Sequence, residues 1–130
     1  MKTIKGYRFV TQGLRSRRGE AQWVIGEWNK LNNNRPLVIC WNGFHASKRP
    51  YDSFLYQFGT RWFECEARGH IIEADDKFCA REMRLVKEIP KAVLNQFAND
   101  IDDNFRKFKE TGGKRHLNNL IKKYINANIS

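Results

Sequence analysis

Hydrophobic and polar residues alternate over short stretches in the first two-thirds of the chain, a pattern typical of β-strands. Aromatic and β-branched residues gather in three such stretches: TIKGYRFV (3–10), QWVIGEW (22–28) and the apolar run LVICW (37–41). Turn-forming residues separate them, with a glycine-bounded basic loop before the second stretch and NNNRP (32–36) before the third. We therefore predict three strands before residue 42, where Asn42–Gly43 turns the chain toward FHAS (44–47).

The clearest alternation lies at residues 61–69. It predicts a strand with Phe63, Cys65 and Ala67 on one side and Trp62, Glu64, Glu66 and Arg68 on the other. ADDK (74–77) then forms a turn. MRLVKEI (83–89) is a further predicted strand with Met83, Leu85 and Ile89 toward the core.

Helical signals lie in two places. Pro50 suits the first position of a helix, and residues 51–58 supply a short one that ends before Gly59. After Pro90 the apolar residues recur every three or four positions, at Val93, Leu94, Phe97, Ile101, Phe105 and Phe108. TGG (111–113) breaks this helix, and a second one follows with Leu117, Leu120, Ile121, Tyr124 and Ile125 inward.

The elements together predict an α+β fold. We expect one compact domain with a sheet-rich body at residues 1–90, a short internal helix, and a C-terminal helical hairpin at residues 91–130 packed on the body. The length of 130 residues is that of one domain with a real core.

Composition excludes several classes of protein. Hydrophobic residues make up 41% of the chain, which indicates a globular protein rather than a disordered one. The apolar runs are too short to span a membrane, and the N-terminus has no apolar segment that would act as a secretory signal. Three cysteines, an odd number, argue against a disulfide framework and fit a reducing cytosol.

The charge of the chain is +10 and it is unevenly distributed. Residues 1–49 hold ten basic and two acidic residues, a net charge of +8, whereas residues 50–90 have a net charge of −2 and residues 91–130 one of +4. Such a distribution attracts polyanions such as nucleic acid or an acidic protein surface. The residues predicted to bind them are Arg15, Arg17, Arg18, Lys48 and Arg49, with Lys122 and Lys123 second.

Three motifs follow one another in a fixed order. They are Cys40 with Gly43, Phe44 and His45, followed by Pro50 and Asp52; then Phe63 to Gly69; then Asp75 to Lys77. In these motifs the chain resembles an uncharacterised family of small domains encoded by phages and prophages, with a C-x-x-G-F-H segment, an F-E-V-E-A-x-G strand and a D-D-K turn. Cys65 stands where that family often has valine. The resemblance covers about residues 6–90 and implies a phage-related origin more than a chemistry.

Cysteine and histidine suggest two kinds of chemistry. Cys40 with His45 and Cys65 with His70 share one spacing and would supply four zinc ligands, but neither pair has the tight knuckle of zinc sites and Cys65 is expected to face inward. A Cys40–His45 nucleophile lacks the surroundings of known cysteine enzymes. We predict no metal site, a buried Cys40 and a His45 tied to a turn.

An enzyme using NAD is the alternative function. NGFHAS (42–47) is similar to a segment that lines the NAD pocket of ADP-ribosyltransferase-like folds, including RNA 2′-phosphotransferases. That resemblance implies roles for Arg8 as a phosphate clamp, His45 as a stacking residue and Glu64 or Glu66 as a polarising acid. The usual flanking histidine or arginine signature is missing.

The function that we favour is binding without catalysis. We predict a small basic phage-derived protein that acts in the bacterial cytoplasm and binds nucleic acid or a host nucleoprotein. Its role would be that of an anti-defence factor of the anti-CRISPR kind or a host-takeover factor, with no cofactor. Trp23, Trp28 and Trp41 lie among the basic segments, and rings exposed there would stack on unpaired bases. A core position is the other interpretation of these tryptophans. An inhibitor that binds only a host protein is the third class.

Overall fold

A computed structural model describes residues 3–16, 21–54, 59–96 and 99. The chain divides into two compact units, Met1–Glu88 and Ile89–Ser130. In the second unit the description covers residues 89–96 and 99, with Pro90 followed by a helical segment at residues 91–96. No helix among the described residues is both long and apolar enough to cross a membrane.

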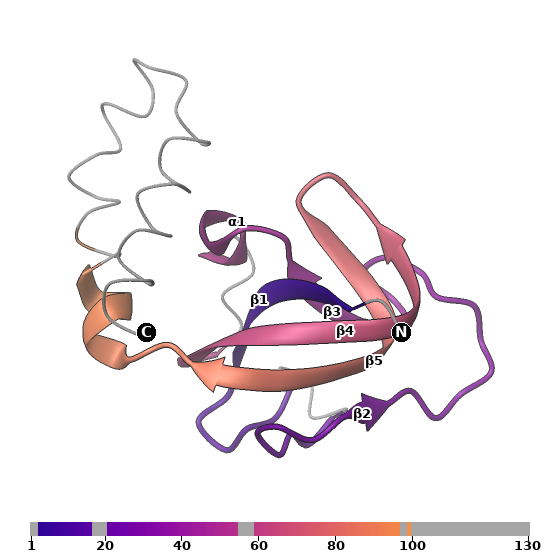
Figure 1. The fold of residues 1–130 in the computed structure, drawn as a ribbon, viewed down its shortest axis with the longest axis horizontal. Helices are drawn as coiled ribbons and strands as arrows, with labels where there is room; N and C mark the ends of the chain where they lie inside the picture. Colours follow the sequence, from indigo (N-terminus) through magenta and orange to yellow (C-terminus); the bar gives the residue numbers. More distant parts are fainter. Residues whose placement is uncertain (1–2, 17–20, 55–58, 97–98, 100–130) are drawn as a thin grey trace. The chain divides into compact units, whose positions relative to one another are not determined.

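The first unit is a small closed barrel of antiparallel strands (Figure 1). Strand β1 (Ile4–Val10) pairs with β3 (Phe44–Ser47) on one edge and with β4 (Arg61–Glu73) on the other. Strand β5 (Lys77–Glu88) pairs with both β3 and β4, so the ring of four strands closes. The short strand β2 (Asn29–Lys30) adds to β5 beside β3.

The lengths of β4 and β5 explain the closure. β4 pairs with β1 along Arg61–Ala67, and its remaining residues continue to pair with β5 alone. A register shift between Arg68 and Ile71 contains Gly69, whose φ of 80° is one that glycine adopts without strain. Such a bulge bends a strand and increases its twist, which lets one long hairpin contribute to both sides of a narrow barrel.

Side chains from every strand of the ring fill the barrel. Phe63, Cys65 and Ala67 are buried there, as the alternation at residues 61–69 predicts, and Met83 and Leu85 join them from β5. The rest of this barrel core is Val10, Trp23, Ala46, Phe78 and Ala80. The inward side predicted for Met83 and Leu85 is therefore confirmed.

A second apolar layer lies outside the barrel under helix α1 (Pro50–Phe54), which begins at the proline as predicted. Trp62 points to this outer side, as predicted, but it is 1% exposed because its ring stacks on Phe9 at 5.6 Å between centroids. Its indole N–H donates to the hydroxyl of Ser53 at 3.0 Å. One face of α1 is thereby tied to the outer face of β1 and β4.

Two of the predicted strands are wrong. Residues 22–28 contain one isolated bridge at Gln22 and a turn at residues 25–26, and residues 37–41 form a bridge and a turn rather than a strand. The strand of this region is β3, at FHAS, which follows a turn at residues 39–41, the bridge residue Asn42 and a bend at Gly43. Because the run 37–41 packs as a turn, Cys40 is exposed and the prediction of a buried Cys40 is also wrong.

The α+β class is wrong as well. The described residues are mostly strand, and they form a small closed four-stranded barrel with one added strand and one short helix rather than an α+β domain. No C-terminal helical hairpin is found in the described part of the chain. Most of the sequence predicted to form that hairpin, residues 100–130, lies outside the described residues.

Candidate nucleic-acid interface

Residues 11–43 join β1 to β3, and we call them the β1–β3 connection. Its described residues, 11–16 and 21–43, follow the outside of the barrel (Figure 1). They contain five basic and two acidic residues. The barrel holds the connection at several points: the backbone N–H of Gly26 donates to the carbonyl of Leu85 at 2.7 Å, and that of Leu31 donates to the carbonyl of Arg81 at 2.8 Å. The barrel therefore holds the described part of the connection, residues 11–16 and 21–43, at defined points.

Trp23 anchors the connection in the barrel core. It is 1% exposed, its indole N–H donates to the hydroxyl of Ser16 at 3.2 Å, and its ring meets Phe44 edge-on. The guanidinium of Arg8 lies 4.8 Å from the centroid of the Trp23 ring and donates to the carbonyl of His45 at 2.9 Å. For Trp23, the core interpretation of the sequence is confirmed.

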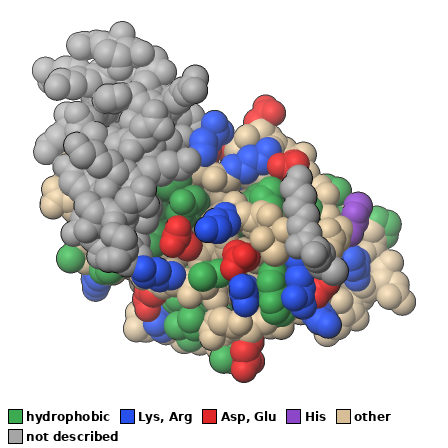
Figure 2. Space-filling view, viewed as in Figure 1, with side chains coloured by type: hydrophobic (Ala, Val, Ile, Leu, Met, Phe, Trp, Pro, Cys, Tyr) green, Lys and Arg blue, Asp and Glu red, His purple; other side chains and the backbone are tan. Residues whose placement is uncertain are grey.

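Trp28 is half-buried among paired charges on the outer face of β4 and β5. The guanidinium of Arg68 lies 3.9 Å from its ring centroid and that of Arg84 lies 4.9 Å from it. These two arginines pair across the strands, Arg68 with Glu82 and Arg84 with Glu66. Figure 2 shows this mixture of charges, with basic and acidic side chains interleaved over the barrel. Trp28 is thus engaged within the protein.

Trp41 differs from the other two. It is 80% exposed, in a tight turn at residues 38–42 that we call the Trp41 loop. The N–H groups of Trp41 and Asn42 both donate to the carbonyl of Val38, at 3.0 and 2.9 Å. Cys40 has a φ of 71°, a left-handed conformation that is costly for a residue with a Cβ.

His45 holds this loop in place. Its Nε2 accepts the backbone N–H of Cys40 at 2.7 Å, and its Nδ1 lies 3.0 Å from the carbonyl oxygen of Gly43. Burial lowers the pKa of His45, and the cations of Arg8 and Lys77 lower it further, while the contact with Gly43 acts in the opposite direction. A neutral ring that bonds the loop through both nitrogens is the turn anchor that the sequence predicts.

Asn42 ties the Trp41 loop to residues 35 and 36, and Arg81 in turn ties residues 33 and 35 to β5. The Asn42 side chain donates to the carbonyls of Arg35 and Pro36 at 3.1 and 2.9 Å, and Arg81 donates from β5 to the carbonyls of Arg35 and Asn33. Gly43 has a φ of 130°, and a Cβ there would lie 2.9 Å from a methyl carbon of Leu37, so glycine is required.

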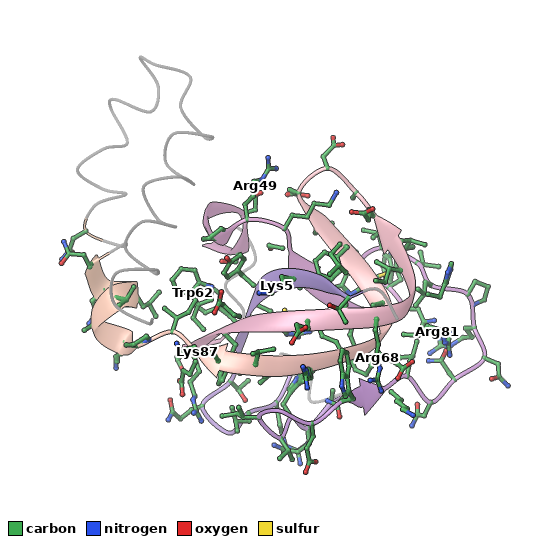
Figure 3. All side chains as sticks on the ribbon, viewed as in Figure 1. Lys5, Arg49, Trp62, Arg68, Arg81 and Lys87 are labelled. Carbon is green, nitrogen blue, oxygen red and sulfur yellow. The ribbon has the colours of Figure 1, made fainter. Side chains whose placement is uncertain are left out.

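The structure places the predicted binding residues in three different situations. Arg15 is exposed in the β1–β3 connection. Lys48 pairs with Glu73 at 3.2 Å, and Arg49 pairs with the buried Asp52 at 2.6 Å beside α1, well away from Arg81 and the connection in Figure 3. The other four lie outside the described residues: Arg17, Arg18, Lys122 and Lys123.

Most acidic side chains of α1, β4 and β5 form ion pairs, whereas basic side chains on the β1–β3 connection form none within the described part of the chain. Asp52, Glu66, Glu73, Glu82 and Glu88 each pair with a lysine or arginine. By contrast, Arg15, Lys30 and Arg35 are exposed on the connection and form no ion pair with any residue that the structure describes. The sequence prediction missed Lys30 and Arg35, although Arg35 follows the NNN turn and Lys30 lies just before it.

The residues of the NAD alternative do not form one site: Arg8 donates to the backbone of His45, but Glu64 does not join them and Glu66 pairs with Arg84. Arg8 pairs in register with Phe63 and points into the barrel, whereas Glu64 lies opposite Tyr7 on the outer face. Burial first and then Glu64 raise the pKa of that tyrosine to about 12. Arg8 and Glu64 therefore lie on opposite sides of one sheet, and His45 is engaged with its own loop.

The four candidate zinc ligands are also separated. Cys65 is buried in the barrel core, Cys40 is exposed on the Trp41 loop, and His70 is exposed at the β4 bulge. Within the described ranges, no group of three or more histidine, cysteine or acidic side chains is placed to hold a metal ion.

Fold and surface together define a small basic β-barrel protein that displays an aromatic loop and unpaired cations on one connection. Residues 4–96 match the family described as Domain of unknown function (DUF7666), and the chain belongs to that family. The match includes the whole barrel and the first residues after Pro90. No curated protein and no solved structure matches the chain.

Proposed function

We propose that the protein binds nucleic acid through the β1–β3 connection. One observation carries the proposal: the unpaired cations Arg15, Lys30 and Arg35 lie on this one segment, while the acidic residues of β4 and β5 are largely held in ion pairs. Unpaired, exposed cations attract phosphates, because no internal carboxylate competes for them.

The chemistry of these side chains supports phosphate binding. A guanidinium presents a planar fork of N–H donors that bonds two phosphate oxygens, and Arg15 and Arg35 both offer one. The segment that carries them is hydrogen-bonded to β5, so little order must be gained on binding. Lys48 and Arg49 rank second, since each must leave an acidic partner to contact phosphate.

Fluorescence anisotropy with a labelled oligonucleotide tests the proposal. The variant Arg15→Ala/Lys30→Ala/Arg35→Ala is compared with Lys5→Ala/Lys87→Ala/Lys91→Ala, which loses the same net charge from exposed positions outside the connection. We expect the first variant to lose about tenfold or more in affinity, because each exposed cation contributes a charge-assisted interaction with phosphate. Equal losses in the two variants would contradict a role specific to the connection, and no binding by the unmodified protein would end the proposal.

For the biological role of this binding, we keep the proposal made from the sequence. A phage-related origin and an anti-defence or host-takeover role stay predictions, and a host nucleoprotein is the partner that would combine both. Affinity capture from a bacterial lysate, with and without nuclease, separates the possibilities. A captured protein that is lost after nuclease treatment indicates a bridge through nucleic acid, and one that is retained indicates direct protein binding.

A further inference from the structure

The Trp41 loop presents an aromatic side chain in an unusual way. A tryptophan that is 80% exposed leaves a large apolar surface in water, while Trp23 and Trp62 of the same protein are 1% exposed. Such exposure is expected where a ring contacts a partner. The hydrogen bonds that hold the loop come from its backbone and from the side chains of His45 and Asn42, so the Trp41 side chain is not needed to hold the loop.

The loop is rigid at the position where the ring projects. Cys40, directly before Trp41, is held in a left-handed conformation by its bond to His45, and Asn42, directly after it, is held by Arg35 and Pro36. A strained residue persists only where its surroundings fix it, and such residues concentrate at functional sites. A ring fixed in advance loses little conformational entropy on binding.

Basic residues contact the two neighbours of Trp41 in the chain, Cys40 and Asn42. The ammonium of Lys77 lies 3.0 Å from Sγ of Cys40, so a positive charge lies beside the residue before Trp41. The residue after it, Asn42, is bonded to the backbone of Arg35, whose side chain is exposed and makes no ion pair with a described residue. Exposed aromatic rings on a basic segment are typical of proteins that bind single strands, with a base stacked on the ring and the phosphates held by nearby cations.

We propose that Trp41 is a stacking platform for one unpaired base, and that the protein therefore prefers single-stranded to double-stranded nucleic acid. This inference rests on the proposed function, since it names the nucleic acid that the same surface takes. In a duplex each base face is covered by its neighbours, so the indole ring cannot stack there and only the phosphates are available. The cations would then bind the phosphates of single-stranded and double-stranded nucleic acid alike, and stacking on Trp41 would add affinity only for the single strand.

The test measures anisotropy with a labelled single strand, with the matching duplex, and with a single strand that has abasic sites at its centre. The proteins are the full chain, Trp41→Ala and Trp41→Phe, the last of which keeps an aromatic face. We expect Trp41→Ala to lose roughly tenfold in affinity for the single strand and to keep its affinity for the duplex. Trp41→Phe is expected to keep most of the single-strand affinity.

The abasic strand isolates the stacking interaction. The unmodified protein should bind it less tightly than the intact strand by the same factor that Trp41→Ala loses, and the two changes together should cost no more than either alone. Because the Trp41 side chain is 80% exposed, the melting temperature of both variants should equal that of the parent, which excludes misfolding as the cause.

Three results would overturn the inference. If Trp41→Ala binds the single strand as well as the parent does, or loses equally on both nucleic acids, Trp41 is not a base platform. If nucleic-acid binding is unchanged in Trp41→Ala but a complex with a host protein is lost, the ring is instead a contact for protein. Failure of the unmodified protein to bind either nucleic acid would refute the proposed function itself, a different outcome from these three.

Discussion

The backbone N–H of Cys40 donates to Nε2 of His45 at 2.7 Å, so the imidazole bonds a residue five positions before it in the chain. An N–H only donates, so Nε2 must be the unprotonated nitrogen and Nδ1 carries the proton that it donates to the carbonyl of Gly43 at 3.0 Å. The bond from Cys40 therefore requires the neutral ring. It ties the conformation of the Trp41 loop to the protonation state of one histidine.

This hydrogen bond predicts a loss of stability in acid. The pKa of His45 lies below its ordinary value of 6.5 in the folded protein, chiefly because of burial. Between the lowered pKa and 6.5 the unfolded chain binds more protons than the folded one, so the free energy of unfolding falls as the pH drops through 6.5. Urea unfolding at a series of pH values measures this change.

Two histidine variants assign the pH effect. His45→Ala should lower the free energy of unfolding at neutral pH by about 1–3 kcal/mol, because both hydrogen bonds of the ring are removed, and should abolish the part of the pH dependence that His45 causes. His70→Ala is the matched control, since His70 is exposed at the β4 bulge. If both variants keep the parent's pH profile, His45 does not anchor the loop in its neutral form.

The three cysteines should differ sharply in reactivity. Cys65 is 1% exposed and burial raises its pKa to about 12, and burial likewise raises the pKa of Cys79. Cys40 is exposed on the Trp41 loop. Titration of the native protein with a thiol reagent should therefore give one fast thiol that is absent in Cys40→Ser, and the other two only after denaturation. A second fast thiol in the native protein would mean that the barrel core opens to the reagent.

Arg49 should stabilise the fold more than Lys48 does. The carboxylate of Asp52, its partner at 2.6 Å, is 0% exposed, so Arg49→Ala leaves a buried charge with one cation fewer. We expect a loss of about 2 kcal/mol in the free energy of unfolding. Lys48→Ala removes a more exposed pair with Glu73 and should cost less than about 1 kcal/mol. Similar melting temperatures for the two variants would show that Arg49 is dispensable to the fold.

Local patterns predicted local features of this protein well. The alternation of Phe63, Cys65 and Ala67 against their neighbours was readable, because a strand with one face on a core has a period of two. Pro50 marked the start of α1 for an equally local reason, its fixed φ. The short apolar run at 37–41 was wrongly predicted to be a strand, because a run of this length has no periodicity that distinguishes a strand from a packed turn.

Local sequence patterns did not predict the closed barrel or the candidate interface. Closure depends on the pairing of β5 with β3 and β4 together, and no local pattern specifies pairing between distant segments. Residues 61–88 contain both signs of charge in similar numbers, and only the structure reveals which are paired across strands. Arg35 and Lys30 are candidate phosphate-binding residues because they are exposed and do not take part in these ion pairs.

The salt dependence of binding tests the central claim most directly, since each phosphate that a cation neutralises releases a counterion. The dissociation constant for a labelled single strand is measured from about 50 mM to about 200 mM salt for the parent and for Arg15→Ala/Lys30→Ala/Arg35→Ala. We predict a steep loss of affinity with salt in the parent and a slope lower by about 2 in the variant, or about 0.7 for each cation removed. A parent affinity that does not change with salt, or an identical slope in the variant, would contradict nucleic-acid binding through the β1–β3 connection.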